Sequence, residues 1–194
     1  MKTIDYYNQH ADTFVASTFY VEMEEIYQPF VRYLPDGGNI LDLGCGSGRD
    51  SLAFKKLGYQ VEAIDYSEEL VTKVRELTGI NVRQQNFYEL SELNQYDGIW
   101  ACASLLHCER KRLPEVLEKI LKALKVNGIC YTSFKYGAGD RYKDGRQFTD
   151  MDESQAQSLL KKFDNILLLQ QWITIDKRPD HNEDWLNIVF QKQN

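Results

Sequence analysis

Apolar residues along this chain fall into short runs that alternate with longer segments of helical periodicity. The short runs lie near residues 39–43, 60–64, 80–84 and 97–101, with helical segments at 47–57 and 67–78 between the first three. Short apolar runs bounded by turn residues indicate buried strands. Strands that alternate with helices along a chain predict an α/β fold with a parallel sheet.

The clearest helical pattern surrounds Pro114. Its apolar residues recur at i, i+3, i+4, i+7, i+8 and i+11, namely Leu113, Val116, Leu117, Ile120, Leu121 and Leu124. Proline suits the first turn of a helix. The pair Asn127-Gly128 tolerates left-handed backbone, so we expect the helix to end there, before a fifth strand at 129–134.

Both ends of the chain add further elements. Residues 5–19 and 22–33 predict two aromatic-rich helices ahead of the sheet, and a helix is expected at about 152–163. The last two strands, 166–175 and 185–190, lie close together and should pair antiparallel at the sheet edge. The result is a Rossmann-like sheet of seven strands, mostly parallel, with helices on both faces and an antiparallel last strand. We expect a single domain over 1–194.

Three glycines at alternate positions follow the first strand, at Gly44, Gly46 and Gly48. Glycine adopts backbone conformations closed to other residues and lets a ligand approach bare main chain. A dinucleotide fingerprint would need G-x-G-x-x-G, but the required third glycine is absent, since position 49 is Arg49. Asp42, just before the turn, suits a cofactor that carries an ammonium group.

A second acid, Asp65, closes the second strand about twenty residues past the turn, where a carboxylate can hold a ribose 2′-OH. With this acid, the motif 40–50 and the segments 96–100 and 124–128 resemble the class I S-adenosylmethionine-dependent methyltransferases. Segments 97–107 and 133–137 are similar to small stand-alone bacterial enzymes grouped with tellurite-resistance methyltransferases. The resemblance covers residues 36–191 and implies S-adenosyl-L-methionine as methyl donor.

Ligands of open α/β sheets bind beyond the carboxyl ends of the strands. The expected cofactor-binding residues are Asp42, Gly44, Cys45, Gly46, Gly48, Arg49, Asp65, Tyr66, Asn86, Phe87, Ala101 and Tyr7. The resemblance implies that Asn86 and Phe87 lie near the adenine, although many relatives carry an acid where Asn86 stands. It also implies that Tyr7 reaches the site from a helical cap over residues 1–35. Phe87 can equally be a core aromatic, and Tyr7 can dock its helix onto the sheet.

His107 is expected to be the catalytic residue, because it follows the fourth strand inside a matched segment. An imidazole there could deprotonate an acceptor or hydrogen-bond it, and it could equally cap its loop. Basic residues gather after the fifth strand and between the last two. Lys135, Arg146 and Arg178 are expected to hold an anionic acceptor by charge-assisted hydrogen bonds. Neighbouring acids could instead neutralise these cations, namely Asp140, Asp144, Asp150 and Asp176.

Composition narrows the class of partner. The net charge of −6 argues against nucleic acid, whose phosphates favour a basic surface. No apolar run approaches the ~20 residues of a membrane span. The four cysteines form no C-x-x-C pair, and free thiols indicate a cytoplasmic setting. No metal-ligand spacing is evident; a soft-metal or arsenical site at Cys45, Cys102 and Cys108 is a minor alternative.

The sequence thus predicts S-adenosylmethionine-dependent methyl transfer to a small anionic acceptor such as tellurite or a carboxylate metabolite, by a monomer or homodimer. One alternative is a methyltransferase of RNA or protein, with a cationic groove at 110–112 and 135–146. Against base methylation, segment 101–104 reads Ala-Cys-Ala-Ser, where an N/D-P-P-Y-type tetrapeptide would be needed. The other alternative is a non-catalytic module that binds S-adenosylmethionine.

Overall fold

The computed structural model describes residues 2–179 and 181–194. They fold around a seven-stranded sheet of order β3-β2-β1-β4-β5-β9-β8, with strands β1 (Asn39–Leu43), β2 (Gln60–Asp65), β3 (Val82–Gln84), β4 (Tyr96–Ala101), β5 (Leu124–Lys135), β8 (Ile166–Ile175) and β9 (Asp184–Lys192). Strands β1 to β5 pair parallel, and β9 runs antiparallel to both β5 and β8. The predicted fold class is confirmed.

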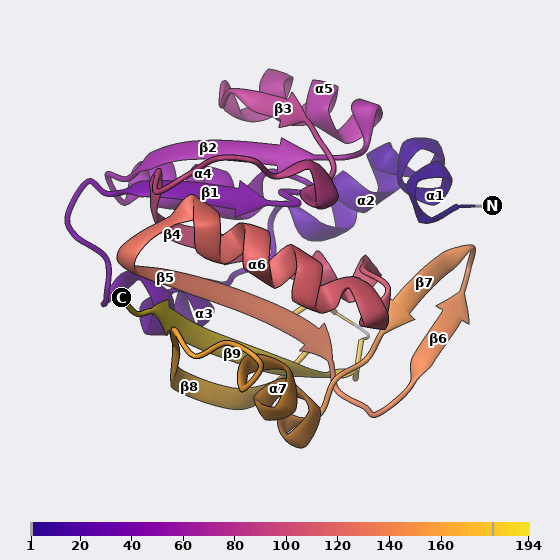
Figure 1. Ribbon diagram of the computed structural model, residues 1–194. Helices are drawn as coiled ribbons and strands as arrows, with labels where there is room; N and C mark the ends of the chain where they lie inside the picture. The colour runs from indigo at the N-terminus through magenta and orange to yellow at the C-terminus, as the bar shows by residue number, and fades with distance from the viewer. Residues whose placement is uncertain (1, 180) are drawn as a thin grey trace.

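Helices cover both faces of this sheet (Figure 1). Their bounds are α1 (Thr3–Gln9), α2 (Ala11–Thr18), α3 (Glu24–Val31), α4 (Arg49–Lys56), α5 (Glu68–Thr78), α6 (Leu113–Ala123) and α7 (Glu153–Leu160). Helices α6 and α7 lie in front of the sheet in Figure 1, and α3 and α4 lie behind it. Three short 3-10 turns complete the loops at the carboxyl ends of the strands: η1 (Phe87–Glu89), η2 (Leu105–His107) and η3 (Arg110–Arg112).

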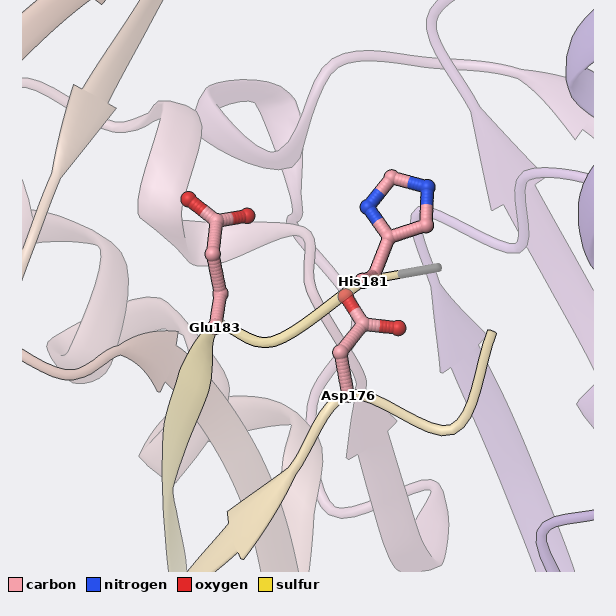
Figure 2. A group of neighbouring side chains, drawn as sticks. All are labelled: Asp176, His181 and Glu183. Atoms are coloured by element: carbon pink, nitrogen blue, oxygen red, sulfur yellow. The ribbon is translucent and has the colours of Figure 1, made fainter. Parts of the chain in front are cut away.

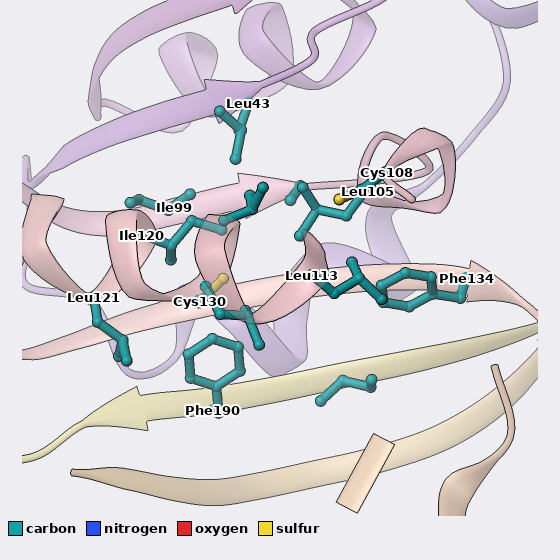
Figure 3. Close-up of a cluster of buried hydrophobic side chains, with 14 of the residues drawn as sticks. Leu43, Ile99, Leu105, Cys108, Leu113, Ile120, Leu121, Cys130, Phe134 and Phe190 are labelled. Carbon is teal, nitrogen blue, oxygen red and sulfur yellow. The ribbon is translucent and has the colours of Figure 1, made fainter. Parts of the chain in front are cut away.

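The apolar stripe of α6 explains the largest core cluster. Its residues Leu113 and Ile120 are fully buried against side chains of β4, β5 and β9, among them Ile99, Cys130 and Phe190 (Figure 3). All four cysteines are free thiols. Burial of this stripe removes apolar surface from water, at about 25 cal/mol per Å², and so holds α6 on the sheet.

A second cluster on the opposite face is aromatic. The rings of Trp100 on β4 and Tyr131 on β5 stack with their centroids 3.8 Å apart. Phe30 of α3 and Phe54 of α4 pack around them. Trp100 also connects β4 to α4, because its Nε1–H donates to the carboxylate of Asp50 at 2.8 Å. This cluster ties the start of α4, and with it the glycine turn, to the centre of the sheet.

Two predicted helix boundaries were wrong. Residues 5–19 form two helices, because the chain breaks at His10, whose ring nitrogen Nδ1 lies 2.9 Å from the carbonyl oxygen of Tyr6. Helix α6 ends at Ala123, and the left-handed Asn127 (φ 65°) lies inside β5, at a register shift against β4. A left-handed residue can form a strand irregularity as well as a helix end.

The basic segment after β5 is a hairpin and not the expected loop. Strands β6 (Asp140–Lys143) and β7 (Arg146–Thr149) pair antiparallel. Their turn residues Asp144 (φ 50°) and Gly145 (φ 76°) both adopt left-handed backbone, as a type I′ turn requires, and Asp-Gly favours such turns. The hairpin lies beside α1 in Figure 1, where the Gln147 backbone N–H donates to Thr3 Oγ1 at 3.1 Å.

Candidate active site at the carboxyl edge of the sheet

A cavity of about 640 Å³ opens beyond the carboxyl ends of β1, β2, β4 and β5. The glycine turn forms one wall, and residues of α1, α2 and β7 and of the turn 176–183 between β8 and β9 form the others. This is the edge at which open α/β sheets bind ligands. The volume falls within the ~300–1,000 Å³ typical of small-molecule sites.

The glycine turn requires glycine for two separate reasons. Gly44 (φ 83°) has left-handed backbone, and a Cβ there would lie 2.5 Å from the Cβ of Ser104. Gly48 (φ 78°) begins α4, and a Cβ there would lie 2.5 Å from Cγ1 of Val74 in α5. The turn is therefore packed tightly from behind, and it offers bare main chain to the cavity at Gly44 and Gly46.

Asp65 connects this turn to the start of α5. Its Oδ2 accepts the backbone N–H of Gly46 at 2.9 Å, and its Oδ1 accepts that of Ser67 at 2.8 Å. Burial raises the pKa of Asp65 to about 6, although these backbone donors act in the opposite direction. The carboxylate lines the cavity with its orientation fixed, and its remaining lone pairs can accept hydroxyl groups of a ribose.

Asp50 also lines the cavity, although it is not among the site residues predicted from the sequence. It accepts hydrogen bonds from Tyr27 Oη at 2.6 Å, Trp100 Nε1 at 2.8 Å and Arg49 Nε at 2.6 Å. Burial alone would raise the pKa of Asp50, but the Arg49 guanidinium and the hydrogen bonds lower it. A buried carboxylate so thoroughly paired stabilises the start of α4 and keeps Arg49 in the cavity wall.

Asp42 lies behind the wall and not in it. Ser51 Oγ donates to its Oδ2 at 2.5 Å, and the residue is 2% exposed. Burial raises the pKa of Asp42 to about 8, and the nearby charge of Asp50 adds to the rise. The geometry thus places Asp42 beneath the turn, where it supports α4.

Most of the expected cofactor-binding residues do line the cavity: Tyr7, Gly44, Cys45, Gly46, Arg49, Asp65, Tyr66, Asn86 and Phe87. Asp42, Gly48 and Ala101 are buried outside it. Asn86 uses its carbonyl oxygen to accept the Tyr88 backbone N–H at 3.0 Å, which caps η1. Phe87 lines the cavity and also packs against the core, so both interpretations of its role describe it.

His107 lines the cavity with both ring nitrogens engaged. Its Nδ1 lies 2.7 Å from the Gln147 carbonyl oxygen, and its Nε2 lies 2.7 Å from the hydroxyl of Tyr7. Burial lowers the pKa of His107 to about 4, and the charges of Arg146 and Lys135 also lower it. The imidazole is therefore neutral near pH 7.

All three expected acceptor-binding cations form ion pairs, but not equally close ones. Lys135 forms an ion pair with Glu183, and Arg178 forms one with Asp176 at 2.6 Å. Arg146 differs, because its nearest carboxylate, that of Asp144, is 3.5 Å away. All three cations line the cavity.

The Arg146 guanidinium lies against aromatic rings. Its Cζ is 3.9 Å from the ring centroid of Tyr6 and 5.2 Å from that of Phe148. Its side chain is only 18% exposed, and its Nε has no hydrogen-bond partner among the described residues. The buried Ser104 Oγ, in another part of the cavity lining, also lacks a partner within the described part of the chain. The Arg146 guanidinium also hydrogen-bonds the Tyr7 hydroxyl.

Asp176, His181 and Glu183 come together in the turn between β8 and β9 (Figure 2), with ligand atoms within 4.8 Å of one another. This group is not evident from the residue spacing, because the pairing of β8 with β9 creates it. Its carboxylates already bind cations: Asp176 binds Arg178, and Glu183 binds Lys135 and Arg141. Arg141 also pairs with Asp150, so three cations meet three carboxylates here, and the two carboxylates of the group already have cationic partners.

Comparison with known proteins agrees with this geometry. Residues 40–128 match the family model described as "Methyltransferase domain". YqeM of Bacillus subtilis, provisionally named a methyltransferase, is 31% identical over 62% of this chain and 52% of its own length. TehB of Haemophilus influenzae, named a probable S-adenosyl-L-methionine-dependent methyltransferase, is 26% identical over 66% of this chain and 43% of its own length. The matches thus span about half of each relative.

The fold is shared with a Burkholderia thailandensis enzyme, 1,6-didemethyltoxoflavin-N1-methyltransferase, whose structure contains S-adenosylhomocysteine. The TM-score is 0.79 at 19% identity, over 98% of this chain and 85% of that one. The chain thus shares the fold of this methyltransferase, and its residues 40–128 match the methyltransferase-domain model. The glycine turn and the fixed Asp65 carboxylate fit a cofactor such as the S-adenosylhomocysteine of that structure. Over residues 2–179 and 181–194, no helix is long and apolar enough to cross a membrane.

Proposed function

We propose that this protein transfers the methyl group of S-adenosyl-L-methionine to a small anionic acceptor held by Arg146. The observation that carries the proposal is the contrast among the cavity cations. Lys135 and Arg178 have close carboxylate partners, whereas Arg146 forms only a longer ion pair with Asp144, at 3.5 Å, and its Nε has no partner among the described residues. A largely buried guanidinium with such a weakly held counter-ion favours an anionic ligand, because it can donate two parallel hydrogen bonds to an oxyanion.

The cofactor supplies a methyl group already activated by its sulfonium, so the protein needs to position the acceptor and to exclude water. Orientation of two reactants can contribute ~7–11 kcal/mol to lowering a barrier. Asp65 and the glycine turn would hold the donor, and Arg146 would hold the acceptor from the opposite wall. Oxyanions such as tellurite and small carboxylate metabolites are the two acceptor classes that this arrangement suits.

The contacts of the basic segment 110–112 disfavour a macromolecular acceptor. Arg110 binds the carboxylate of Asp140 at 2.7 Å and the carbonyl oxygen of Asp150 at 2.6 Å. Arg112 pairs with Glu115 at 2.9 Å, and its guanidinium lies 3.5 Å from the ring centroid of Tyr88. These cations are engaged within the protein, so the groove that RNA or an acidic protein would need is largely neutralised.

The test begins with calorimetric binding of S-adenosylmethionine and S-adenosylhomocysteine, followed by turnover with a panel of small carboxylates and oxyanions and their neutral analogues. Formation of S-adenosylhomocysteine reports transfer and separates an enzyme from a module that only binds the cofactor. We expect turnover of anions, and an increase of about tenfold or more in acceptor KM in Arg146→Gln, since a charged hydrogen bond contributes ~1.5–3 kcal/mol.

The matched control is Arg112→Gln, which removes the same charge outside the cavity. It should leave acceptor KM and affinity for S-adenosylhomocysteine unchanged. Turnover of neutral analogues in preference to the anions would contradict the proposal. So would an Arg146→Gln variant that loses affinity for S-adenosylhomocysteine while keeping its acceptor KM.

A further inference from the structure

The pair formed by Tyr7 and His107 has a fixed hydrogen-bond direction. The backbone carbonyl of Gln147 can only accept, so the His107 Nδ1 at 2.7 Å from it must carry the proton. In a neutral imidazole the other nitrogen, Nε2, is then an acceptor. The Tyr7 hydroxyl, 2.7 Å from Nε2, must therefore donate its proton to His107.

The surroundings keep both groups in these protonation states. Burial lowers the pKa of His107 to about 4, and Arg146 and Lys135, the cations that face it, act in the same direction. Burial raises the pKa of Tyr7 to about 12, although the charge and hydrogen bonding of Arg146 oppose the rise. Near neutral pH the tyrosine is thus a phenol and the histidine a neutral imidazole.

A hydroxyl whose proton is committed to His107 presents only lone pairs to its remaining neighbours. Tyr7 lines the cavity from α1. Its ring packs edge to face against that of Phe14, with 5.2 Å between the ring centroids. The same Phe14 lies against the glycine turn, where its Cε1 is 3.1 Å from the position of a Cβ on Gly46. The Tyr7 oxygen is consequently an acceptor of hydrogen bonds located between the glycine turn and Arg146, which already donates to it, and one lone pair remains for a ligand.

We propose that Tyr7 accepts a hydrogen bond from an N–H or O–H on the reacting atom of the acceptor, and that His107 is the residue that positions the Tyr7 hydroxyl for this contact. The inference rests on the proposed function and narrows it. The acceptor carries an anionic group for Arg146 and a proton-bearing nitrogen or oxygen nucleophile for Tyr7. An acceptor without a proton on its nucleophilic atom gains nothing from this contact.

Long-range proton–nitrogen NMR of labelled histidine tests the arrangement without any acceptor. In the wild type saturated with S-adenosylhomocysteine, His107 should remain the neutral tautomer with the proton on Nδ1 from pH 5 to pH 8. Tyr7→Phe should shift the Nε2 resonance and leave the tautomer unchanged, because the Gln147 carbonyl is retained. A protonated His107, or a proton on Nε2, at pH 7 would overturn the proposal.

Turnover tests the role. Glycine and N,N-dimethylglycine share a carboxylate, and both must lose an ammonium proton to solvent before the nitrogen can react. The neutral nitrogen of glycine then still bears N–H, whereas that of N,N-dimethylglycine does not, and the panel would include further pairs of this kind. Tyr7→Phe should lower kcat/KM about tenfold for the proton-bearing member of a pair that the wild type turns over, and by less than twofold for the other. His107→Gln should show the same selectivity, and the double variant should lose little more than either single one. A merely structural role would lower both members equally.

Two results separate this inference from the proposed function, and a third overturns both. Turnover confined to anions without a proton on the reacting atom, tellurite among them, would overturn the inference and leave the proposed function intact. Loss of affinity for S-adenosylhomocysteine in Tyr7→Phe would assign Tyr7 to the cofactor and overturn the inference alone. If no anion is turned over although the cofactor binds, the proposed function fails and this inference fails with it.

Discussion

The two halves of the cavity are built in different ways. The half proposed to bind the cofactor, called the cofactor half, consists of the glycine turn 44–48 and the end of β2, and its central contact joins a backbone N–H of Gly46 to the Asp65 carboxylate. The half proposed to bind the acceptor, called the acceptor half, consists of α1, the β6–β7 hairpin, η2 and the cavity residues Asp176, Arg178 and Glu183. Its contacts join side chains, such as Tyr7 with His107 and Arg178 with Asp176.

This difference predicts how each half responds to change. Backbone geometry in the cofactor half leaves no space for a substitution, so an added atom should abolish binding. Side-chain pairs in the acceptor half can be exchanged one at a time, so substitutions there should adjust affinity and selectivity. A fold can keep one cofactor site while its acceptor site changes, and this division shows a physical reason for it.

The largest effect is expected for Gly44→Ala. A Cβ at Gly44 would lie 2.5 Å from the Ser104 Cβ, and the backbone is left-handed at φ 83°. The turn must move, so affinity for S-adenosylhomocysteine in calorimetry should fall more than 100-fold, a cost above ~2.7 kcal/mol. Gly79→Ala is the control, since Gly79 has φ 64° but nothing within 4 Å of its Cβ position. It should cost only ~1–2 kcal/mol of stability and leave affinity unchanged; equal loss in both variants would contradict the comparison.

The two halves should also respond to pH with opposite sign. The folded-state pKa of His107 is about 4, below its ordinary 6.5, so the unfolded chain binds more protons and stability rises with pH between these values. The pKa of Asp65 is about 6, above its ordinary 3.8, so stability falls with pH over that window. Asp42, with a pKa of about 8, adds to this fall in stability and extends it to higher pH. The two slopes oppose each other in the wild type.

Chemical denaturation of the wild type, His107→Gln and Asp65→Asn between pH 4 and pH 8 separates these contributions. One pKa unit corresponds to about 1.4 kcal/mol. The stability of His107→Gln relative to the wild type should therefore increase by up to about 3 kcal/mol from pH 7 to pH 4. The relative stability of Asp65→Asn should decrease over the same range. Parallel pH profiles for all three proteins would show that neither group is perturbed as the structure indicates.

A smaller loss is expected when Asp65→Asn is tested for cofactor binding. An amide cannot accept from both Gly46 and Ser67 with the strength of a carboxylate, and its NH₂ group must face one of these N–H donors. Loss of a charged hydrogen bond of ~1.5–3 kcal/mol predicts a decrease of about 10- to 100-fold in affinity for S-adenosylhomocysteine. Asp164→Asn, on the exposed surface, should change nothing. An unaltered affinity in Asp65→Asn would remove this residue from the ribose site.

The cofactor half could be predicted from the sequence because its parts are local. The glycine spacing, Asp65 and the strands around them follow from residues that are neighbours in the chain, and the strand order follows from the alternation of strands and helices. Even here Asp50 was missed. Its importance depends on Tyr27 and Trp100, which come from two other elements.

The acceptor half could be predicted only in part. His107, Lys135 and Arg146 were selected as single residues, but their partners depend on contacts between distant segments, such as that of Tyr7 with His107. The pairing of β8 with β9 likewise brings Asp176 beside Glu183. One missed element did have a local signal. The Asp144-Gly145 pair between β6 and β7 is typical of a two-residue hairpin turn.

That turn provides the smallest effect and the most selective test of the acceptor half. Asp144 holds the carboxylate nearest to Arg146, at 3.5 Å, and asparagine tolerates the same left-handed backbone and favours the same turn. Asp144→Asn should therefore keep the hairpin and strengthen the electrostatic attraction between Arg146 and an anion. Partly exposed ion pairs contribute ~0–1 kcal/mol, so acceptor KM should fall at most about fivefold. The gain should shrink as salt is added and be absent in Arg146→Gln. An increase in KM would mean that the Asp144 carboxylate itself binds the acceptor, which would require a cationic acceptor and reverse the charge assigned to this half of the site.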